Sequence, residues 1–167
     1  MATENVFILG QESGIIRLNT LESIQQADLA LASQVRRQLL LLSHDLDLAR
    51  FGASSWLEAL KPFWHERDAM LRILVAHPET ALALSHPLLA LARRLTSYIQ
   101  IKKIDPALYP AEESWLIADG LALVREQKPG MAYADMRSLS TAPELTERFN
   151  AWFTHASDIA ELRSLML

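Results

Sequence analysis

Residues 112–125 decide the fold, and they read Glu-Glu-Ser-Trp-Leu-Ile-Ala-Asp-Gly-Leu-Ala-Leu-Val-Arg. Asp119-Gly120 separates two apolar runs. This dipeptide between hydrophobic runs favours a type I′ hairpin, because both residues adopt positive φ at low cost. We therefore expect strands at residues 114–118 and 121–125. The first run is apolar almost throughout, which is typical of a strand covered on both faces in a layered α/β domain.

Other strands are predicted on both sides of this hairpin. Residues 39–43 and 71–76 are nearly continuous apolar runs and indicate buried strands, whereas residues 98–104 alternate and indicate a half-exposed strand. Weaker patterns predict short strands at residues 6–9, 14–18 and 131–135.

Helical periodicity separates most of these strands. Helices are predicted at residues 20–35, 54–65 and 84–95, from residue 141 onward, and at residues 159–167. Pro62 bends or ends the second of them early, and Pro87 either kinks the third or lies in the first turn of a separate helix. Alternating helices and strands imply right-handed crossovers and a largely parallel sheet, to which the hairpin adds an antiparallel pair. The predicted fold class is α/β, with a mixed sheet flanked by helices.

Length and composition limit the classes of function. A chain of 167 residues is the size of one domain, so residues 1–167 are expected to share one core. The net charge of −4 opposes a general attraction to nucleic acid or to anionic lipid. The absence of cysteine fits a reducing compartment, and no segment has the length of a membrane span or the pattern of a signal peptide. We therefore expect a cytoplasmic protein.

Polar side chains follow two of the predicted parallel strands. His44 and Asp45 end the strand at residues 39–43, and His77 follows the strand at residues 71–76. Ligands of such folds lie beyond the carboxyl ends of the parallel strands. If the two strands are adjacent, both imidazoles share one rim. The alternative is that each histidine simply begins a loop.

A family resemblance rests on five segments. They are residues 43–47 (Ser-His-Asp-Leu-Asp), 56–60 (Trp-Leu-Glu-Ala-Leu), 72–75 (Arg-Ile-Leu-Val), 92–95 (Ala-Arg-Arg-Leu) and 115–119 (Trp-Leu-Ile-Ala-Asp). Together they resemble an uncharacterised bacterial domain of the phospholipase D superfamily, some members of which follow acetyltransferase domains. The resemblance covers about residues 20–157 and implies a phospholipase D-like fold.

The superfamily signature is degenerate in this chain. It consists of His-x-Lys, four residues, and Asp; Asp119 matches, whereas Glu112 stands at the histidine position and Ser114 at the lysine position. The resemblance implies that the histidine attacks phosphorus and the lysine stabilises phosphoryl charge. A carboxylate repels an anionic phosphodiester, and a serine carries no positive charge. Asp119 has a simpler interpretation as the first residue of the tight turn.

Other residue patterns in the sequence do not indicate a particular kind of functional site. The histidines lack the short helical spacing of a metal site, and no Gly-x-Ser-x-Gly segment indicates a serine nucleophile, so neither a metal nor a cofactor is predicted. The basic pairs at residues 36–37, 93–94 and 102–103 either gather into an anion-binding patch or remain solvated at the ends of their elements.

Two hypotheses follow from these patterns. The first is a non-catalytic phospholipase D-like module, a pseudoenzyme that binds an anionic ligand or a protein partner such as an acetyltransferase. The second is a hydrolase with an active site rebuilt at the carboxyl-end rim of the sheet. The residues expected to line the cleft are His44, Asp45, His77, Glu112, Ser114 and Asp119. A homodimer is a further expectation, because single-motif members of the superfamily bring two copies of the motif together.

Overall fold

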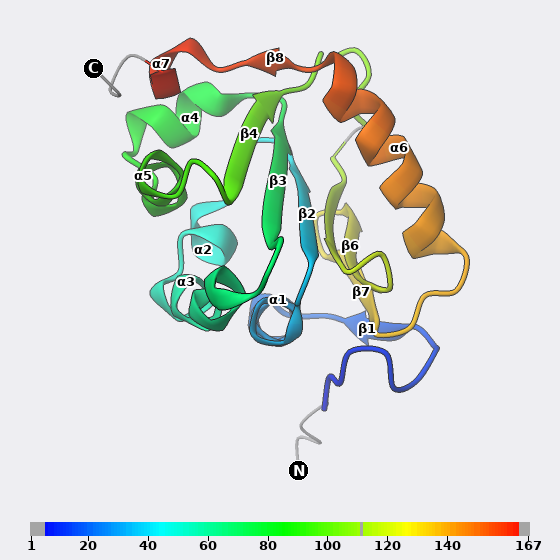
Figure 1. Cartoon of the computed structure of the whole chain (residues 1–167). Helices are drawn as coiled ribbons and strands as arrows, with labels where there is room; N and C mark the ends of the chain where they lie inside the picture. Colours follow the sequence, from blue (N-terminus) through cyan, green and yellow to red (C-terminus); the bar gives the residue numbers. More distant parts are fainter. Residues whose placement is uncertain (1–5, 111, 164–167) are drawn as a thin grey trace.

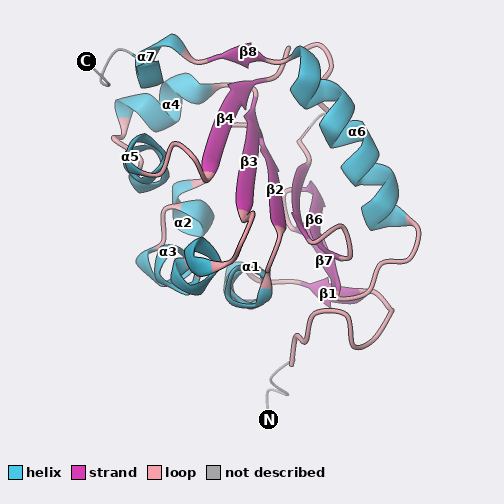
Figure 2. Ribbon diagram, viewed as in Figure 1, coloured by secondary structure: helices cyan, strands magenta, loops and turns pink. Residues whose placement is uncertain are grey.

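One mixed sheet of eight strands forms the centre of the protein (Figures 1 and 2). The computed structural model describes residues 6–110 and 112–163. The strands lie in the order β1-β7-β6-β5-β2-β3-β4-β8. They are β1 (Ile16–Leu18), β2 (Gln38–Ser43), β3 (Met70–Val75), β4 (Ile99–Lys103), β5 (Ser114–Ala118), β6 (Ala122–Lys128), β7 (Met131–Asp135) and β8 (Ser157–Asp158).

The strand directions agree with the predicted mixed sheet. Strands β2, β3 and β4 are parallel neighbours, whereas β5 runs antiparallel to β2 and continues through β6 and β7 to β1 in antiparallel order. In the β2–β5 pair, Leu39 lies opposite Ala118 and Leu42 lies opposite Trp115. The first residues of β5 therefore lie at the same edge of the sheet as the carboxyl end of β2.

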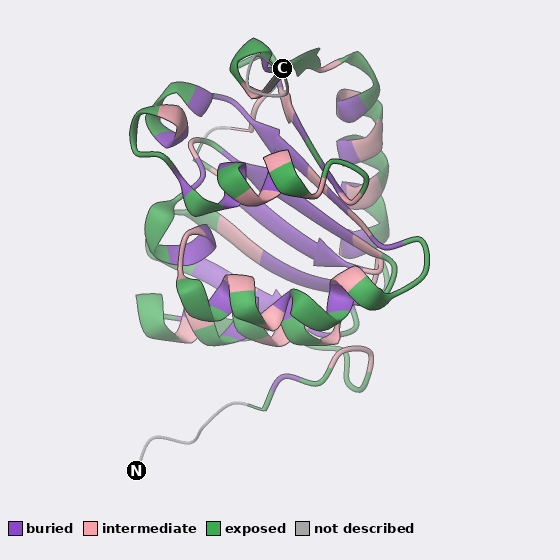
Figure 3. Ribbon diagram, turned by 60° about the vertical axis from the view of Figure 1, so that its left-hand side comes forward, coloured by how far each residue is buried: buried purple, intermediate pink, exposed green. Residues whose placement is uncertain are grey.

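Helices cover the two faces unequally (Figure 1). On one face the sheet buries hydrophobic residues against α1 to α5, and on the other, among the described helices, it packs against α6. Figure 3 shows the buried strands between helices whose outer surfaces are exposed. The helices are α1 (Leu21–Gln34), α2 (Leu48–Phe51), α3 (Ser54–Ala59), the 3-10 helix η1 (Lys61–His65), α4 (Pro78–Ala83), α5 (Pro87–Arg94), α6 (Thr141–His155) and α7 (Ala160–Arg163).

The central hairpin has the predicted turn. Asp119 and Gly120 adopt φ of 53° and 65°, and the N–H of Leu121 donates to the carbonyl of Ala118 at 3.0 Å. The Asp119 carboxylate also accepts hydrogen bonds from three consecutive backbone N–H groups, those of residues 36, 37 and 38, at 2.8 to 3.0 Å. Asp119 therefore fixes the start of β2 as well as the turn.

Several local predictions were wrong. Residues 6–9 form no strand; instead, the Gln34 side chain bonds the backbone there, accepting from the N–H of Leu9 and donating to the carbonyl of Phe7. A side-chain amide thus replaces a strand partner. The helix predicted at residues 84–95 is shorter and begins at Pro87 as α5, which is one of the two alternatives that Pro87 indicated, and the separate helix α4 before it was not predicted. The predicted last helix is described only as far as residue 163, and residues 164–167 lie outside the described part of the chain.

Candidate functional site

Two histidines meet at the carboxyl ends of the adjacent strands β2 and β3. The His44 and His77 rings lie 4.6 Å apart between centroids and are inclined by 50°. The N–H of His77 donates to the carbonyl of His44 at 2.8 Å, which holds the two chain segments together just beyond the strands. Parallel strands that are neighbours end at one edge, so the shared rim expected from the sequence is present.

A cleft of about 560 Å³ lies at this rim. Besides the two histidines, its walls include Tyr109 from the connection between β4 and β5, Glu112 from just before β5, and Pro129 from the turn after β6. Tyr109 meets His44 edge-on, with 5.7 Å between ring centroids. A pocket of this volume with aromatic walls and a few polar groups is large enough for a small ligand.

Tyr109 is held as a neutral phenol. Its hydroxyl donates a hydrogen bond to the backbone carbonyl of Glu113. Burial raises the pKa of Tyr109 far above its ordinary value, and the nearby carboxylates of Asp45 and Glu113 raise it further. The phenol therefore orders the connection between β4 and β5 and does not serve as a base near neutral pH.

Carboxylates surround the histidines. Glu112 is exposed in the cleft, and Asp45 is half-buried directly after His44. Glu79 lies 3.9 Å from Nδ1 of His77 and 3.7 Å from Nζ of Lys103. These contacts are exposed and contribute little stability, but they set the sign of the local field. The carboxylates of Asp45, Glu79 and Glu112 at this rim repel an anionic phosphodiester.

Ser114 lies behind the cleft and does not line it. Its hydroxyl accepts a hydrogen bond from Nη1 of Arg50 at 2.8 Å, and Nε and Nη2 of Arg50 donate to the two carboxylate oxygens of Asp28, also at 2.8 Å. Arg50 is 3% exposed and Asp28 is 1% exposed. A buried ion pair between α1 and α2 therefore lies against Ser114, the residue at the lysine position of the superfamily signature.

Further carboxylates face this ion pair. Glu126 lies opposite Ser114 in the β5–β6 register. Burial raises the pKa of Glu126, Arg50 opposes that rise, and Asp47 and Asp28 add to it. The charge of the Arg50 guanidinium is consequently balanced by Asp28 and Glu126, so Arg50 does not provide a positive charge to the cleft.

Asp119 lies at the opposite end of β5 from the cleft. Because β5 is antiparallel to β2, the Asp-Gly turn is next to the first residue of β2, where the Asp119 carboxylate binds the backbone. Of the six residues expected at one site, His44, His77 and Glu112 line the cleft, Asp45 adjoins it, Ser114 lies behind it, and Asp119 is remote. Within residues 6–110 and 112–163, no three histidine or acidic side chains are placed to hold a metal ion.

Sequence reasoning did not identify Asp28, Arg50 or Tyr109. Asp28 did give a signal, because it occurs on the apolar face of α1 beside Ile24 and Leu31, where an unpaired acid is costly. Its partner Arg50 is 22 residues away along the chain, and no local pattern connects the two.

A family model covers almost the whole chain. Residues 20–165 match the model described as "Domain of unknown function (DUF7931)". The chain belongs to the DUF7931 family. No curated protein matches it. Among the helices that the structure describes, none is long and apolar enough to cross a membrane.

Solved structures show the fold of this DUF7931 member. Nuc from Salmonella typhimurium, a phospholipase D family member, has a TM-score of 0.64 at 12% identity, over 89% of this chain and 99% of its own. NucT from Helicobacter pylori has a TM-score of 0.58 at 7% identity over the same shares. TrmBL2, an archaeal chromatin protein with a novel mode of DNA binding, has a TM-score of 0.61 at 11% identity. The match spans 89% of this chain but only 54% of TrmBL2. The chain has a phospholipase D-like fold.

Proposed function

We propose that this DUF7931 protein is a non-catalytic phospholipase D-like module that binds an anionic ligand or a protein partner. The main support is the buried ion pair of Arg50 and Asp28, in which Arg50 also donates a hydrogen bond to Ser114. Phosphodiester cleavage needs a nucleophile and a cation that stabilises charge in the transition state. At the corresponding positions this chain has the carboxylate of Glu112 and a hydroxyl engaged by a neutralised guanidinium.

The charge at the rim favours a protein partner there. Asp45, Glu79 and Glu112 surround His44 and His77, so an anionic ligand meets repulsion at this edge of the sheet. A protein surface with basic side chains and an aromatic or aliphatic residue for the cleft is complementary to it. An acetyltransferase is the partner class that the family resemblance implies.

Phosphodiesterase activity tests the proposal. We expect purified protein to release no product from generic phosphodiesters such as bis(4-nitrophenyl) phosphate above the buffer rate. The double variant Glu112→His/Ser114→Lys is expected to remain inactive, because a lysine at position 114 meets Arg50 and the chain holds one copy of the motif. Turnover by the wild-type protein would overturn the proposal.

A rebuilt hydrolase site is the second candidate. The contact of His44 and His77 inside a cleft favours it, since two adjacent imidazoles can divide proton transfer and substrate binding between them. If the wild-type protein hydrolyses any ester or phosphoester, His44→Gln and His77→Gln should each abolish that activity. His65→Gln is the matched control, because His65 is exposed in η1 and does not line the cleft.

The assembly of the protein belongs to the same proposal. A homodimer that joins two rims would bring a second set of side chains to His44 and His77, and a cytoplasmic location is consistent with the cysteine-free sequence. Light scattering at several protein concentrations measures the oligomeric state. A strictly monomeric protein removes the dimer from the proposal and leaves the partner-binding cleft.

A further inference from the structure

A second cleft lies at the edge of the sheet opposite the histidine rim. It has a volume of about 640 Å³ and lies at the amino ends of β2 and β3 and beside the residues that precede β4. Its walls include Arg37, Arg72, Asp68, Ser97, Tyr98 and Met70. Arg37 belongs to one of the basic pairs seen in the sequence.

Among the residues that the structure describes, the two guanidinium groups in this cleft have no acidic partner. Neither Arg37 nor Arg72 forms an ion pair with any residue in the described ranges. Arg72 instead packs on Phe153 of α6, with 5.3 Å between its Cζ and the ring centroid, and its Nε is buried without a hydrogen-bond partner. Because this Nε is buried, a ligand in the cleft would bind the guanidinium through its Nη atoms.

The backbone holds Arg37 in place while its side chain remains exposed. The N–H of Arg37 donates to the Asp119 carboxylate at 2.8 Å, and its carbonyl accepts from the N–H of Met70 at 3.0 Å. A fixed backbone beneath an exposed arginine limits the entropy lost when the guanidinium engages an anion. Arg36 provides an internal comparison, because Asp119 binds its N–H as well but its side chain does not line the cleft.

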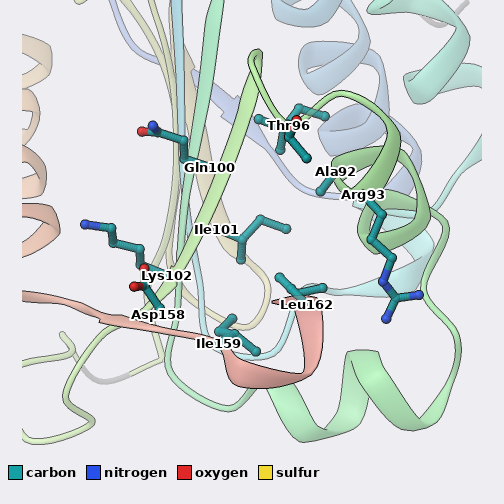
Figure 4. Close-up of a pocket in the computed structure, with 10 residues that line it drawn as sticks. Ala92, Arg93, Thr96, Gln100, Ile101, Lys102, Asp158, Ile159 and Leu162 are labelled. Carbon is teal, nitrogen blue, oxygen red and sulfur yellow. The ribbon is translucent and has the colours of Figure 1, made fainter. Parts of the chain in front are cut away.

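The neighbouring strand extends the positive charge along the same face. Arg72 lies opposite Gln100 in the β3–β4 register. Figure 4 shows the side chains of Gln100 and Lys102 on the opposite side of β4 from that of Ile101, and all three residues line a cleft between α5 and the C-terminal segment. Nζ of Lys102 lies 4.7 Å from the centroid of the same Phe153 ring. Arg72 and Lys102 therefore both contact the Phe153 ring, on a part of the sheet surface that carries polar side chains.

Acidic residues limit this positive region. Asp68 lies in the cleft itself, and Asp158 lies opposite Lys102 in the β4–β8 register. The chain as a whole carries a net charge of −4. A long polyanion would meet these carboxylates and the negative surface, whereas a compact anion is confined to the guanidinium groups.

We propose that this cleft binds a small phosphomonoester, with the phosphate group held between Arg37 and Arg72. Guanidinium forks match phosphate oxygens in geometry and charge. The cleft volume suits a small ligand, and Met70 and Tyr98 provide a surface for the organic part. The site is separate from the histidine rim, so it supplies the anionic ligand of the proposed function without depending on that function. Phosphodiester turnover at the rim would overturn the proposed function and leave this inference intact.

Titrations of the folded protein, followed by ¹H–¹⁵N NMR, test the inference. The probes are inorganic phosphate, adenosine monophosphate, adenosine and a single-stranded oligothymidylate. We expect phosphate and adenosine monophosphate to shift the backbone signals of Met70 and Ser97 and the Nε–H signal of Arg72, with adenosine monophosphate the tighter. Adenosine should bind at least about tenfold more weakly than adenosine monophosphate, because it lacks the charged acceptor.

Three variants locate the phosphate. Arg37→Gln should weaken adenosine monophosphate binding by about tenfold or more, and Arg72→Lys should do the same while keeping the charge, because lysine cannot form the fork. Arg36→Gln is the matched control and should leave the affinity unchanged. A thermal melt of each variant confirms that it is folded.

Three outcomes overturn the inference. The first is the absence of binding by both inorganic phosphate and adenosine monophosphate at millimolar concentration. The second is an equal loss of affinity in Arg36→Gln and Arg37→Gln, which indicates non-specific attraction. The third is binding of the oligothymidylate alone, which makes the cleft a nucleic-acid surface instead of a phosphomonoester site.

Discussion

Removing the acid of the buried ion pair should destabilise the protein severely. Asp28→Leu leaves the Arg50 guanidinium, which is 3% exposed, with Ser114 as its remaining close partner. Two hydrogen bonds of 2.8 Å are lost together with the opposite charge. Breaking a buried pair in this way costs about 3 to 5 kcal/mol, a large part of the stability of a single domain.

A double-mutant cycle separates the charge effect from packing. Arg50→Met alone should cost about as much as Asp28→Leu, because either change leaves one buried charge unpaired. The double variant, which buries two apolar side chains of similar length, should lose much less than the sum, with a coupling free energy of about 3 kcal/mol. Urea denaturation, read by tryptophan fluorescence, gives the free energy of unfolding of each variant at constant m. A loss below about 1 kcal/mol in Asp28→Leu, or additive single losses, would refute the account of a desolvated pair.

Three further predictions concern the core and the caps. Trp115→Ala should lower the free energy of unfolding by about 3 to 5 kcal/mol, because Trp115 is 1% exposed. Trp152→Ala should lower it by about 2 kcal/mol, because Trp152 is half-buried and stacks on Trp115. Equal midpoints of the two variants in a thermal melt would contradict this order. Asp119→Gly should keep the turn but lower the free energy of unfolding by about 2 kcal/mol, since three backbone N–H groups lose their acceptor. An unchanged midpoint of urea denaturation would show that the carboxylate does not contribute to stability. Burial lowers the pKa of His86, so the unfolded chain binds the proton first and stability is lost as the pH falls below the ordinary histidine value of about 6.5. His86→Asn keeps an acceptor for the helix N-cap and should flatten the fall in stability between about pH 7.5 and 5; an unaltered slope would assign the effect to other groups.

Local chemistry explains which parts of the fold could be predicted. The Asp119-Gly120 turn requires positive φ at two adjacent positions, and few dipeptides accept this, so the hairpin could be read from the sequence. The segments 39–42 of β2 and 73–75 of β3 are apolar throughout because helices cover both faces of the sheet there. The same argument placed His44 and His77 at one edge.

The missed features depend on contacts between distant segments. Residues 6–9 have a strand-like composition, but the side chain of Gln34 satisfies their backbone, and nothing near them in the sequence indicates that residue. The four-residue helix α2 is too short for periodicity to show, yet it carries Arg50 to Asp28 and Ser114. Ser114 was expected in the cleft for the same reason, because its sequence position gave no sign of a guanidinium behind it.

The central claim is that the protein does not cleave phosphodiesters, and a comparison of wild type with Glu112→Ala tests it most directly. Both proteins, at equal concentration and confirmed as folded, are incubated with bis(4-nitrophenyl) phosphate, and the released nitrophenolate is followed by absorbance. We expect rates equal to the buffer blank for both proteins. Turnover by the wild-type protein that disappears in Glu112→Ala would contradict it and would make the histidine rim an active site.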